Sequence, residues 1–243
     1  GTVSSGKSGP DRVLPRHILR TWGSNWDVRL QRSQKEKEEK ISFIKGNPSS
    51  YAAMYFLNGM RNDFTLKDYV AIFATFDQSL REMPLGKEMQ GAIDIALRTE
   101  VGATAPNFEK VDKEGNTIRL SDYRGKYVLL DFWGSWCGPC RDSHPHLKKV
   151  EAKYRDKGLV VINIATENGS KAREMWLQAI EEDGMTWTQI LNNEGKDKCD
   201  VVKDYAITAF PTKVLIDDKG KIVVRAVGES EPIDAKLQEV FGE

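Results

Sequence analysis

The sequence of 243 residues is poor in the features that mark several protein classes. Its three cysteines are too few for the disulfide framework of a small secreted domain. It contains no apolar run of about 18 residues, which a transmembrane helix requires. Its 36 basic and 36 acidic side chains cancel, so no basic excess points to nucleic acid as a partner. What remains is 40% hydrophobic and 30% charged residues, the composition of a globular protein with a sizeable core.

The first 23 residues are predicted to be a flexible N-terminal segment, since they open on a stretch without apolar periodicity. Gly1 to Ser8 match the phosphate-loop pattern G-x-x-x-x-G-K-S. That loop functions between a buried strand and a helix, whereas here no strand precedes it and Gly9-Pro10 follow. We therefore interpret the match as a glycine- and serine-rich tail.

Residues 24–100 are predicted to form a helical accessory domain. Gln31–Lys40 is almost wholly charged and indicates a solvated helix. Asn47-Pro48 is expected to cap the next helix, and Thr65 with Asp68 resembles a capping box. Apolar and aromatic residues at helical spacing are interpreted as core rather than as a ligand site: Tyr51, Met54, Tyr55, Leu66, Tyr69, Val70, Phe73, Leu80, Met89, Ile93, Ala96 and Leu97.

From residue 101 onward, short strands alternate with helices. This pattern predicts an α/β domain over residues 101–243, with a mixed sheet flanked by helices. Two nearly all-apolar segments are expected to be strands covered on both faces. The predicted strands are Tyr127–Trp133, Leu159–Ala165, Lys213–Asp217 and Ile222–Val227, and the predicted helices are Gly138–Lys157, Ser170–Asp183 and Pro232–Phe241.

The chemistry-bearing motif is Trp136-Cys137-Gly138-Pro139-Cys140, directly after a buried strand and at the start of the next helix. Thiols at this spacing can close into a disulfide within one helical turn. Cys137 would lie near the helix amino end, where free N–H groups and the dipole favour the reactive thiolate. Cys140, one turn further in, would be shielded and suited to resolving a mixed disulfide.

A zinc site is the alternative, because Cys137, Cys140, His144 and His146 follow the pattern C-x2-C-x3-H-x-H. Adjacent ligands on one helix start do not easily surround a tetrahedral ion, and the two histidines point about 200° apart on a helix. The residues therefore favour redox chemistry. Both histidines are expected on the surface of the helix, with modulation of the thiols as the alternative.

Asp131 is the one charged residue within the strand YVLLDFW. Burial disfavours the charged form of a carboxyl group, and such groups gather at active sites. We expect Asp131 to take the proton from Cys140 as that thiol attacks; a carboxylate at a wet edge is the alternative.

These features resemble the thioredoxin fold, and in particular the exported bacterial TlpA/ResA-like thiol-disulfide oxidoreductases. The resemblance rests on Gly102–Phe108 (GATAPNF), Arg124-Gly125-Lys126, Asp131-Phe132-Trp133, the WCGPC motif and Phe210-Pro211-Thr212. It implies a cis peptide bond before Pro211 and a substrate groove formed by Trp136, Gly138, Pro139, Phe210, Pro211 and Gly228.

The resemblance also implies the partners and the compartment. It implies protein disulfides as substrates, a membrane thiol transporter as a possible electron donor, an exported location and no cofactor or metal. The chain begins with Gly1 rather than Met, so a missing leader does not argue against export.

Three positions depart from the family pattern. Val161 stands where thioredoxin has a lysine near the buried acid, so that partner of Asp131 is expected to be absent. Ser143 stands where ResA-like proteins often carry an active-site glutamate, whereas Pro145 matches the family's kink in the active-site helix. Proton handling should therefore be altered relative to thioredoxin.

The sequence predicts a protein thiol-disulfide oxidoreductase that acts chiefly as a reductant. A thiol peroxidase is one alternative, because the GATAPNF and SDYRGKYVLLDF segments also resemble peroxiredoxins. A redox-linked module that binds a partner is another. Cys199, expected at the start of a short helix, is interpreted as a passive thiol, with a third redox or dimer-forming thiol as the alternative.

Overall fold

The computed structural model describes residues 33–242, and the chain divides into two compact units, residues 1–87 and 88–243. The division falls within the helix α5 (Pro84–Leu97), so the predicted boundary between residues 100 and 101 stays a prediction. The predictions for residues 1–23 lie outside the described residues. No helix of residues 33–242 is long and apolar enough to cross a membrane.

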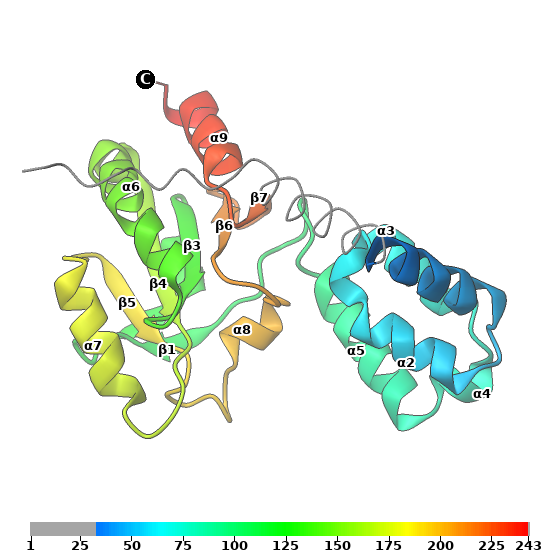
Figure 1. Ribbon diagram of the computed structural model, residues 1–243. Helices are drawn as coiled ribbons and strands as arrows, with labels where there is room; N and C mark the ends of the chain where they lie inside the picture. The colour runs from blue at the N-terminus through cyan, green and yellow to red at the C-terminus, as the bar shows by residue number, and fades with distance from the viewer. Residues whose placement is uncertain (1–32, 243) are drawn as a thin grey trace, which may run out of the picture. The chain divides into compact units, whose positions relative to one another are not determined.

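The segment before the sheet is helical, as predicted (Figure 1). Residues 33–46 form a helix whose first eight side chains are exposed. The remaining elements are α2 (Tyr51–Gly59), a 3-10 helix (Arg61–Asp63), α3 (Leu66–Ala74), α4 (Gln78–Arg81) and α5 (Pro84–Leu97).

The helix caps in this segment follow the prediction at one site and not at the other. The Thr65 hydroxyl accepts a hydrogen bond from the Asp68 backbone N–H at 3.1 Å, as in the predicted capping box. Asn47-Pro48 does not cap α2, because Ser50 is its N-cap. Asn47 instead donates its side-chain amide to the Phe43 carbonyl and closes the preceding helix.

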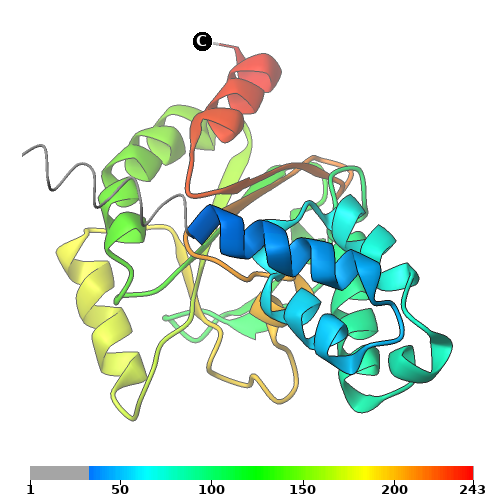
Figure 2. The same ribbon diagram turned by 45° about the vertical axis from the view of Figure 1, so that its right-hand side comes forward.

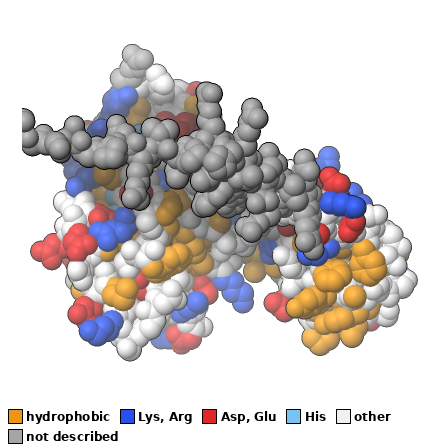
Figure 3. Space-filling model, viewed as in Figure 1, with side chains coloured by type: hydrophobic (Ala, Val, Ile, Leu, Met, Phe, Trp, Pro, Cys, Tyr) orange, Lys and Arg blue, Asp and Glu red, His pale blue; other side chains and the backbone are white. Residues whose placement is uncertain are grey.

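The predicted apolar stripes are only partly core. Met54, Tyr69, Phe73, Met89 and Ile93 are buried, whereas the side chains of Tyr51, Tyr55 and Leu97 are 48–60% exposed. Phe43 and Phe56 are also exposed and meet edge to face at 5.9 Å. Hydrophobic side chains thus gather at the surface of this segment (Figure 3).

The second unit is built on a five-stranded mixed sheet in the order β5-β4-β3-β6-β7. β3 and β4 have the predicted bounds, Tyr127–Trp133 and Leu159–Ala165, and run parallel. β5 (Thr188–Leu191) continues the parallel part, while β6 (Thr212–Ile216) and β7 (Ile222–Val227) form the predicted antiparallel hairpin.

The helices α6 (Gly138–Tyr154), α7 (Ala172–Glu182) and α9 (Glu231–Phe241) lie close to their predicted positions. A 3-10 helix (Arg155–Lys157) ends the first of them. The sequence did not predict the hairpin of β1 (Glu109–Val111) and β2 (Thr117–Arg119), the 3-10 helix Leu120–Tyr123, or β5, since these elements are short and polar. Between β5 and β6 lies the short helix α8 (Val201–Asp204), which begins after its N-cap Asp200.

Each face of the sheet has its own core. On one face, Leu129 and Trp133 of β3 pack with side chains from α6, α7 and α9 and with both cysteines of the WCGPC motif. On the other face, Val128, Leu130 and Phe132 pack with the segment around the β1–β2 hairpin and with α8. Successive side chains of a strand point to opposite faces, so Leu129 and Trp133 contact one core, and Leu130 and Phe132 contact the other. Figures 1 and 2 show the ribbons of α6 and α7 beside the sheet.

Candidate active site

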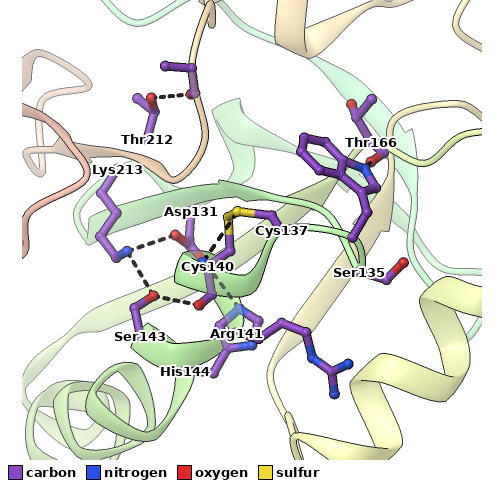
Figure 4. The surroundings of a disulfide bond; sticks show 12 residues. Asp131, Ser135, Cys137, Cys140, Arg141, Ser143, His144, Thr166, Thr212 and Lys213 are labelled. Atoms are coloured by element: carbon purple, nitrogen blue, oxygen red, sulfur yellow. Dashed lines mark hydrogen bonds and ion pairs between the residues drawn. A yellow bond between two sulfur atoms is a disulfide. The ribbon is translucent and has the colours of Figure 1, made fainter. Parts of the chain in front are cut away.

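Cys137 and Cys140 are joined in a disulfide at the start of α6 (Figure 4). Cys137 is the N-cap of this helix, and its sulfur accepts a hydrogen bond from the Cys140 backbone N–H at 3.3 Å. Cys137 keeps 5% exposure and Cys140 none, while Gly138 and Pro139 between them are exposed. The sulfur of Cys137 is thus the one that a substrate can reach, and it lies where the helix dipole favours a thiolate.

The loop before Cys137 is held by the end of β4. Glu167 is buried and accepts hydrogen bonds from both the backbone N–H and the hydroxyl of Ser135, at 2.6 and 2.7 Å. The Trp136 indole N–H donates to the Thr166 carbonyl at 2.9 Å. A Cβ at Gly134 would lie 2.5 Å from that indole nitrogen, so only glycine permits this placement of Trp136. The local sequence does not point to Glu167, because Ser135, which its carboxylate binds, lies 32 positions away.

The segment from Phe210 to Thr212 faces this loop. The Phe210–Pro211 peptide bond is cis, as the resemblance implies. The Phe210 ring meets the Trp136 ring edge to face at 5.5 Å, and the Gly228 backbone N–H donates to the Pro211 carbonyl at 2.9 Å. Trp136 is 49% exposed beside the disulfide. The residues predicted to form a substrate groove therefore lie together around Cys137.

Asp131 is buried at 1% exposure, and it has a lysine partner. The Nζ of Lys213 lies 3.2 Å from Asp131 Oδ1 and 3.3 Å from the Ser143 hydroxyl, which donates to the Cys140 carbonyl at 2.8 Å (Figure 4). The lysine that thioredoxin has at the position of Val161 is absent, as expected, but Asp131 is not left without a cation. Val161 is indeed apolar and buried, but β6 supplies the cation from the opposite side of β3.

Lys213 could have been identified from the sequence by the argument used for Asp131. It is a single charge inside an apolar strand, of opposite sign, and the two strands are neighbours in the sheet. Their register places Lys213 directly opposite Asp131. Across the sheet, Asn163 on β4 and Gln189 on β5 follow Asp131 in the same register and complete a row of four polar residues. All four side chains are buried on the α6 side.

His144 is fully buried, so the expectation of a surface position is wrong for this residue. Its Nδ1 lies 2.7 Å from Asp183 Oδ2, its Nε2 lies 3.9 Å from Asp131 Oδ2, and its ring meets Trp133 edge to face. The helical spacing of Cys140, His144 and Leu147 puts all three on one buried face of α6. This spacing could have predicted from the sequence that His144 is buried. His146, by contrast, is exposed and pairs with Asp234 of α9 at 2.9 Å.

Arg141 anchors the outer end of this cluster. Its guanidinium donates to both oxygens of Asp183 and to Glu182, and these hydrogen bonds raise the pKa of Arg141. Burial alone would raise the pKa of Asp183, but the hydrogen bonds from Arg141 and His144 outweigh it and lower that pKa. Asp183 is therefore a carboxylate at neutral pH.

The four residues of the possible zinc pattern do not converge on one point. The two sulfurs are bonded to each other, His144 faces Asp183 and His146 faces Asp234. Within residues 33–242, no group of three or more His, Cys, Asp or Glu side chains is arranged to hold a metal ion.

Cys199 lies away from the disulfide. It precedes the N-cap of α8 and packs, partly buried, against the core on the other face of the sheet. Its carbonyl accepts a hydrogen bond from the buried Lys110 ammonium at 3.0 Å.

Several known proteins are similar to this chain. The family described as Redoxin matches residues 100–240. The thiol-disulfide oxidoreductase ResA of Bacillus cereus is 30% identical over 153 residues, covering 62% of this chain and 84% of that protein. The thioredoxin domain of a thiol-disulfide oxidoreductase from Bacteroides vulgatus is 34% identical, with a TM-score of 0.52 over 58% of this chain and 98% of that one.

A thiol:disulfide interchange protein from Bacteroides sp. is also 34% identical, with a TM-score of 0.52 over 59% of this chain and 91% of that one. The fold, the cysteine pair at a helix start and these relatives agree with one another. The chain therefore belongs to the redoxin family, as a TlpA/ResA-like thiol-disulfide oxidoreductase with a thioredoxin fold.

Proposed function

We propose that this enzyme acts as a reductant of protein disulfides, with Cys137 as nucleophile and Cys140 as resolving thiol. The observation that supports the proposal is the unequal access of the two cysteines at the amino end of α6, since Cys137 is 5% exposed and Cys140 is fully buried. An attacking thiolate needs both access and a stabilising field, and Cys137 has both.

In the first step, the Cys137 thiolate attacks one sulfur of the substrate disulfide. The bond between the substrate sulfurs breaks, one substrate thiolate leaves, and Cys137 becomes bonded to the other sulfur. Around Cys137, the residues Trp136, Gly138, Pro139 and Gly228 are exposed. Together with partly buried Phe210 and cis-bonded Pro211, they would form the groove in which the substrate chain lies.

In the second step, Cys140 loses its proton and attacks the sulfur of Cys137, which releases the second substrate thiol. We assign Asp131 as the acceptor of that proton. Lys213 binds Asp131 and, through Ser143, the backbone of Cys140, so the acid is held next to the turn that carries the resolving thiol. The direction of electron flow rests on the resemblance of the Cys-Gly-Pro-Cys segment to thioredoxin.

The partners and the compartment are part of the same proposal. We infer that the chain acts in an exported location and receives electrons from a membrane thiol transporter, as its ResA-like sequence suggests. Dependence of its reduced state in cells on such a transporter would support this inference, and full reduction without one would oppose it.

To test this function, we would measure the rate at which the full chain, supplied with a dithiol as electron donor, reduces a protein disulfide. Wild type and a Cys199→Ser variant should turn over at equal rates, and Cys137→Ser should be inactive. Wild-type turnover by Cys137→Ser would contradict the proposal. Rapid thiol-dependent consumption of peroxide, without disulfide reduction, would instead favour a peroxidase.

A further inference from the structure

His144 occupies a position between two carboxylates beneath the disulfide. One ring nitrogen lies 2.7 Å from Asp183 and the other lies 3.9 Å from Asp131, and the ring has no exposed surface. We propose that His144 is a positioning residue that takes up the proton passed to Asp131 when Cys140 is deprotonated, and holds it as an imidazolium against Asp183. This inference rests on the proposed function.

The hydrogen bonds define which ring nitrogen is available. Asp183 is bound by Arg141 and is anionic, so it can only accept hydrogen bonds. The Nδ1 of His144 must then carry a proton. Its Nε2 is left facing Asp131, and it has no hydrogen-bond partner among the described residues. In the neutral ring this nitrogen is a free base, directed at the proposed proton acceptor.

The other groups around Asp131 cannot take this part. Lys213, from β6, is a cation and offers no lone pair. Asn163, opposite Asp131 on β4, does not titrate, and its amide is engaged by the Trp187 indole N–H and by the Met185 sulfur. Trp133, from β3, contacts the His144 ring by an aromatic edge. Among the described neighbours, His144 is thus the one base that can relieve Asp131 of a proton.

In the mixed disulfide, the S–H bond of Cys140 breaks and its proton passes by way of Asp131 to Nε2 of His144. The Cys140 thiolate then forms a bond to the Cys137 sulfur, and the bond from Cys137 to the substrate sulfur breaks. The electron pair leaves with the substrate thiolate, which takes a proton from water. The cysteine pair is oxidised, and the substrate disulfide is reduced by two electrons.

The two chemical steps can be observed separately with an aromatic disulfide as substrate. Reduced protein on the Cys199→Ser background releases one chromophoric thiolate when Cys137 attacks and a second when Cys140 resolves. The variant is His144→Gln, whose amide can still donate a hydrogen bond to Asp183 but cannot become a cation. His146→Gln is the matched control, since His146 lies two residues away on the same helix and pairs with exposed Asp234.

His144→Gln should slow the second release about 10-fold at neutral pH, less than the loss of a directly acting base, which costs ~10²–10⁴-fold. Without the imidazole the proton must rest on a different acceptor, so the acid-side midpoint of the pH–rate profile should move. His146→Gln should match wild type. In ¹⁵N NMR spectra, the neutral His144 ring should carry its proton on Nδ1.

A purely structural role predicts a different result, namely a second release that is slower by one constant factor at every pH. That result overturns the inference, as does an unchanged rate or a neutral ring protonated on Nε2. If the first release is also absent in wild type, the proposed function itself fails. Thermal unfolding of each variant checks that α6 remains folded, and Asp183→Asn, which removes the charge but keeps a hydrogen-bond acceptor, should reproduce the pH shift.

Discussion

The two faces of the central sheet differ in what they bury, although the same strands build both. The face toward the β1–β2 hairpin and α8 is hydrocarbon at its centre, with Val128, Leu130 and Phe132 of β3 beside apolar residues of β4 and β6. The face toward α6 and α7 carries a row of buried polar side chains beneath the disulfide, namely Lys213, Asp131, Asn163 and Gln189.

Burial of charge is a poor way to stabilise a fold, since the desolvation penalty of a buried ion pair can exceed its Coulombic gain. An apolar row would serve stability as well on the α6 side as it does on the other. One face of the sheet therefore serves stability alone, whereas the other buries charge at a cost that the proton transfer proposed next to Cys140 would explain.

The largest effect should come from removing the resolving thiol on the polar face. In Cys140→Ser the first attack still occurs, because Cys137 keeps its place at the helix start, but nothing releases the substrate. The variant should accumulate a mixed disulfide with a protein substrate, visible as a covalent adduct on a non-reducing gel. Turnover should fall to background. Cys137→Ser should form no adduct, and an adduct there would assign the nucleophile to another thiol.

Breaking the ion pair of the polar face should cost stability. Lys213→Met leaves Asp131 buried without its cation, which should lower the free energy of unfolding by about 3–5 kcal/mol in urea titrations. The double variant Asp131→Leu/Lys213→Met should recover most of that loss. It should nevertheless resolve mixed disulfides ~10²-fold more slowly than wild type. Normal resolution by the double variant would show that the row is not used in catalysis.

The matched change on the apolar face is Leu130→Ala, one residue from Asp131 on the same strand. Leu130 is fully buried, so the cavity should cost about 3 kcal/mol. Below its melting temperature the variant should exchange disulfides at the wild-type rate, measured per folded molecule. A large loss of rate would break the separation of the two faces.

The smallest effect concerns the outer end of the polar cluster and depends on pH. The pKa of Asp183 is lowered in the folded chain, so this pair stabilises the fold above the ordinary carboxyl range and loses that contribution as pH falls below about 4. Arg141 is partly exposed, so Arg141→Met should cost only ~1 kcal/mol at pH 7. The difference from wild type should shrink in acid, and a difference that grows there would have the wrong sign.

The apolar strands of the sheet were predicted well from the sequence, whereas the elements and site residues with polar side chains were predicted only in part. β3 and β4 were placed to the residue, because a continuous run of β-prone apolar residues has one interpretation. β5 and the β1–β2 hairpin were missed, since Gln189 and the charged hairpin residues give no apolar run.

The site shows the same limit. The local sequence is enough to identify Cys137 and Cys140 by their spacing, and Asp131 by its lone charge within an apolar strand. Lys213 and His144 both lie next to Asp131, which is 82 and 13 residues away from them in the sequence. Whether residues so far apart meet depends on the order of the strands and on the packing of the helices. Local patterns can show that Lys213 and His144 are buried, but not that both of them meet Asp131.

We propose that Cys137 and Cys140 form a reducing pair, and the first measurement is the dithiol–disulfide equilibrium of these two cysteines. The full chain, carrying Cys199→Ser, is equilibrated with glutathione or thioredoxin couples of known potential, and the oxidised fraction is measured. A reducing pair should have a reduction potential near that of thioredoxin, about −270 mV. A value near −120 mV, that of a strong oxidant, would contradict it and reverse the direction of electron flow.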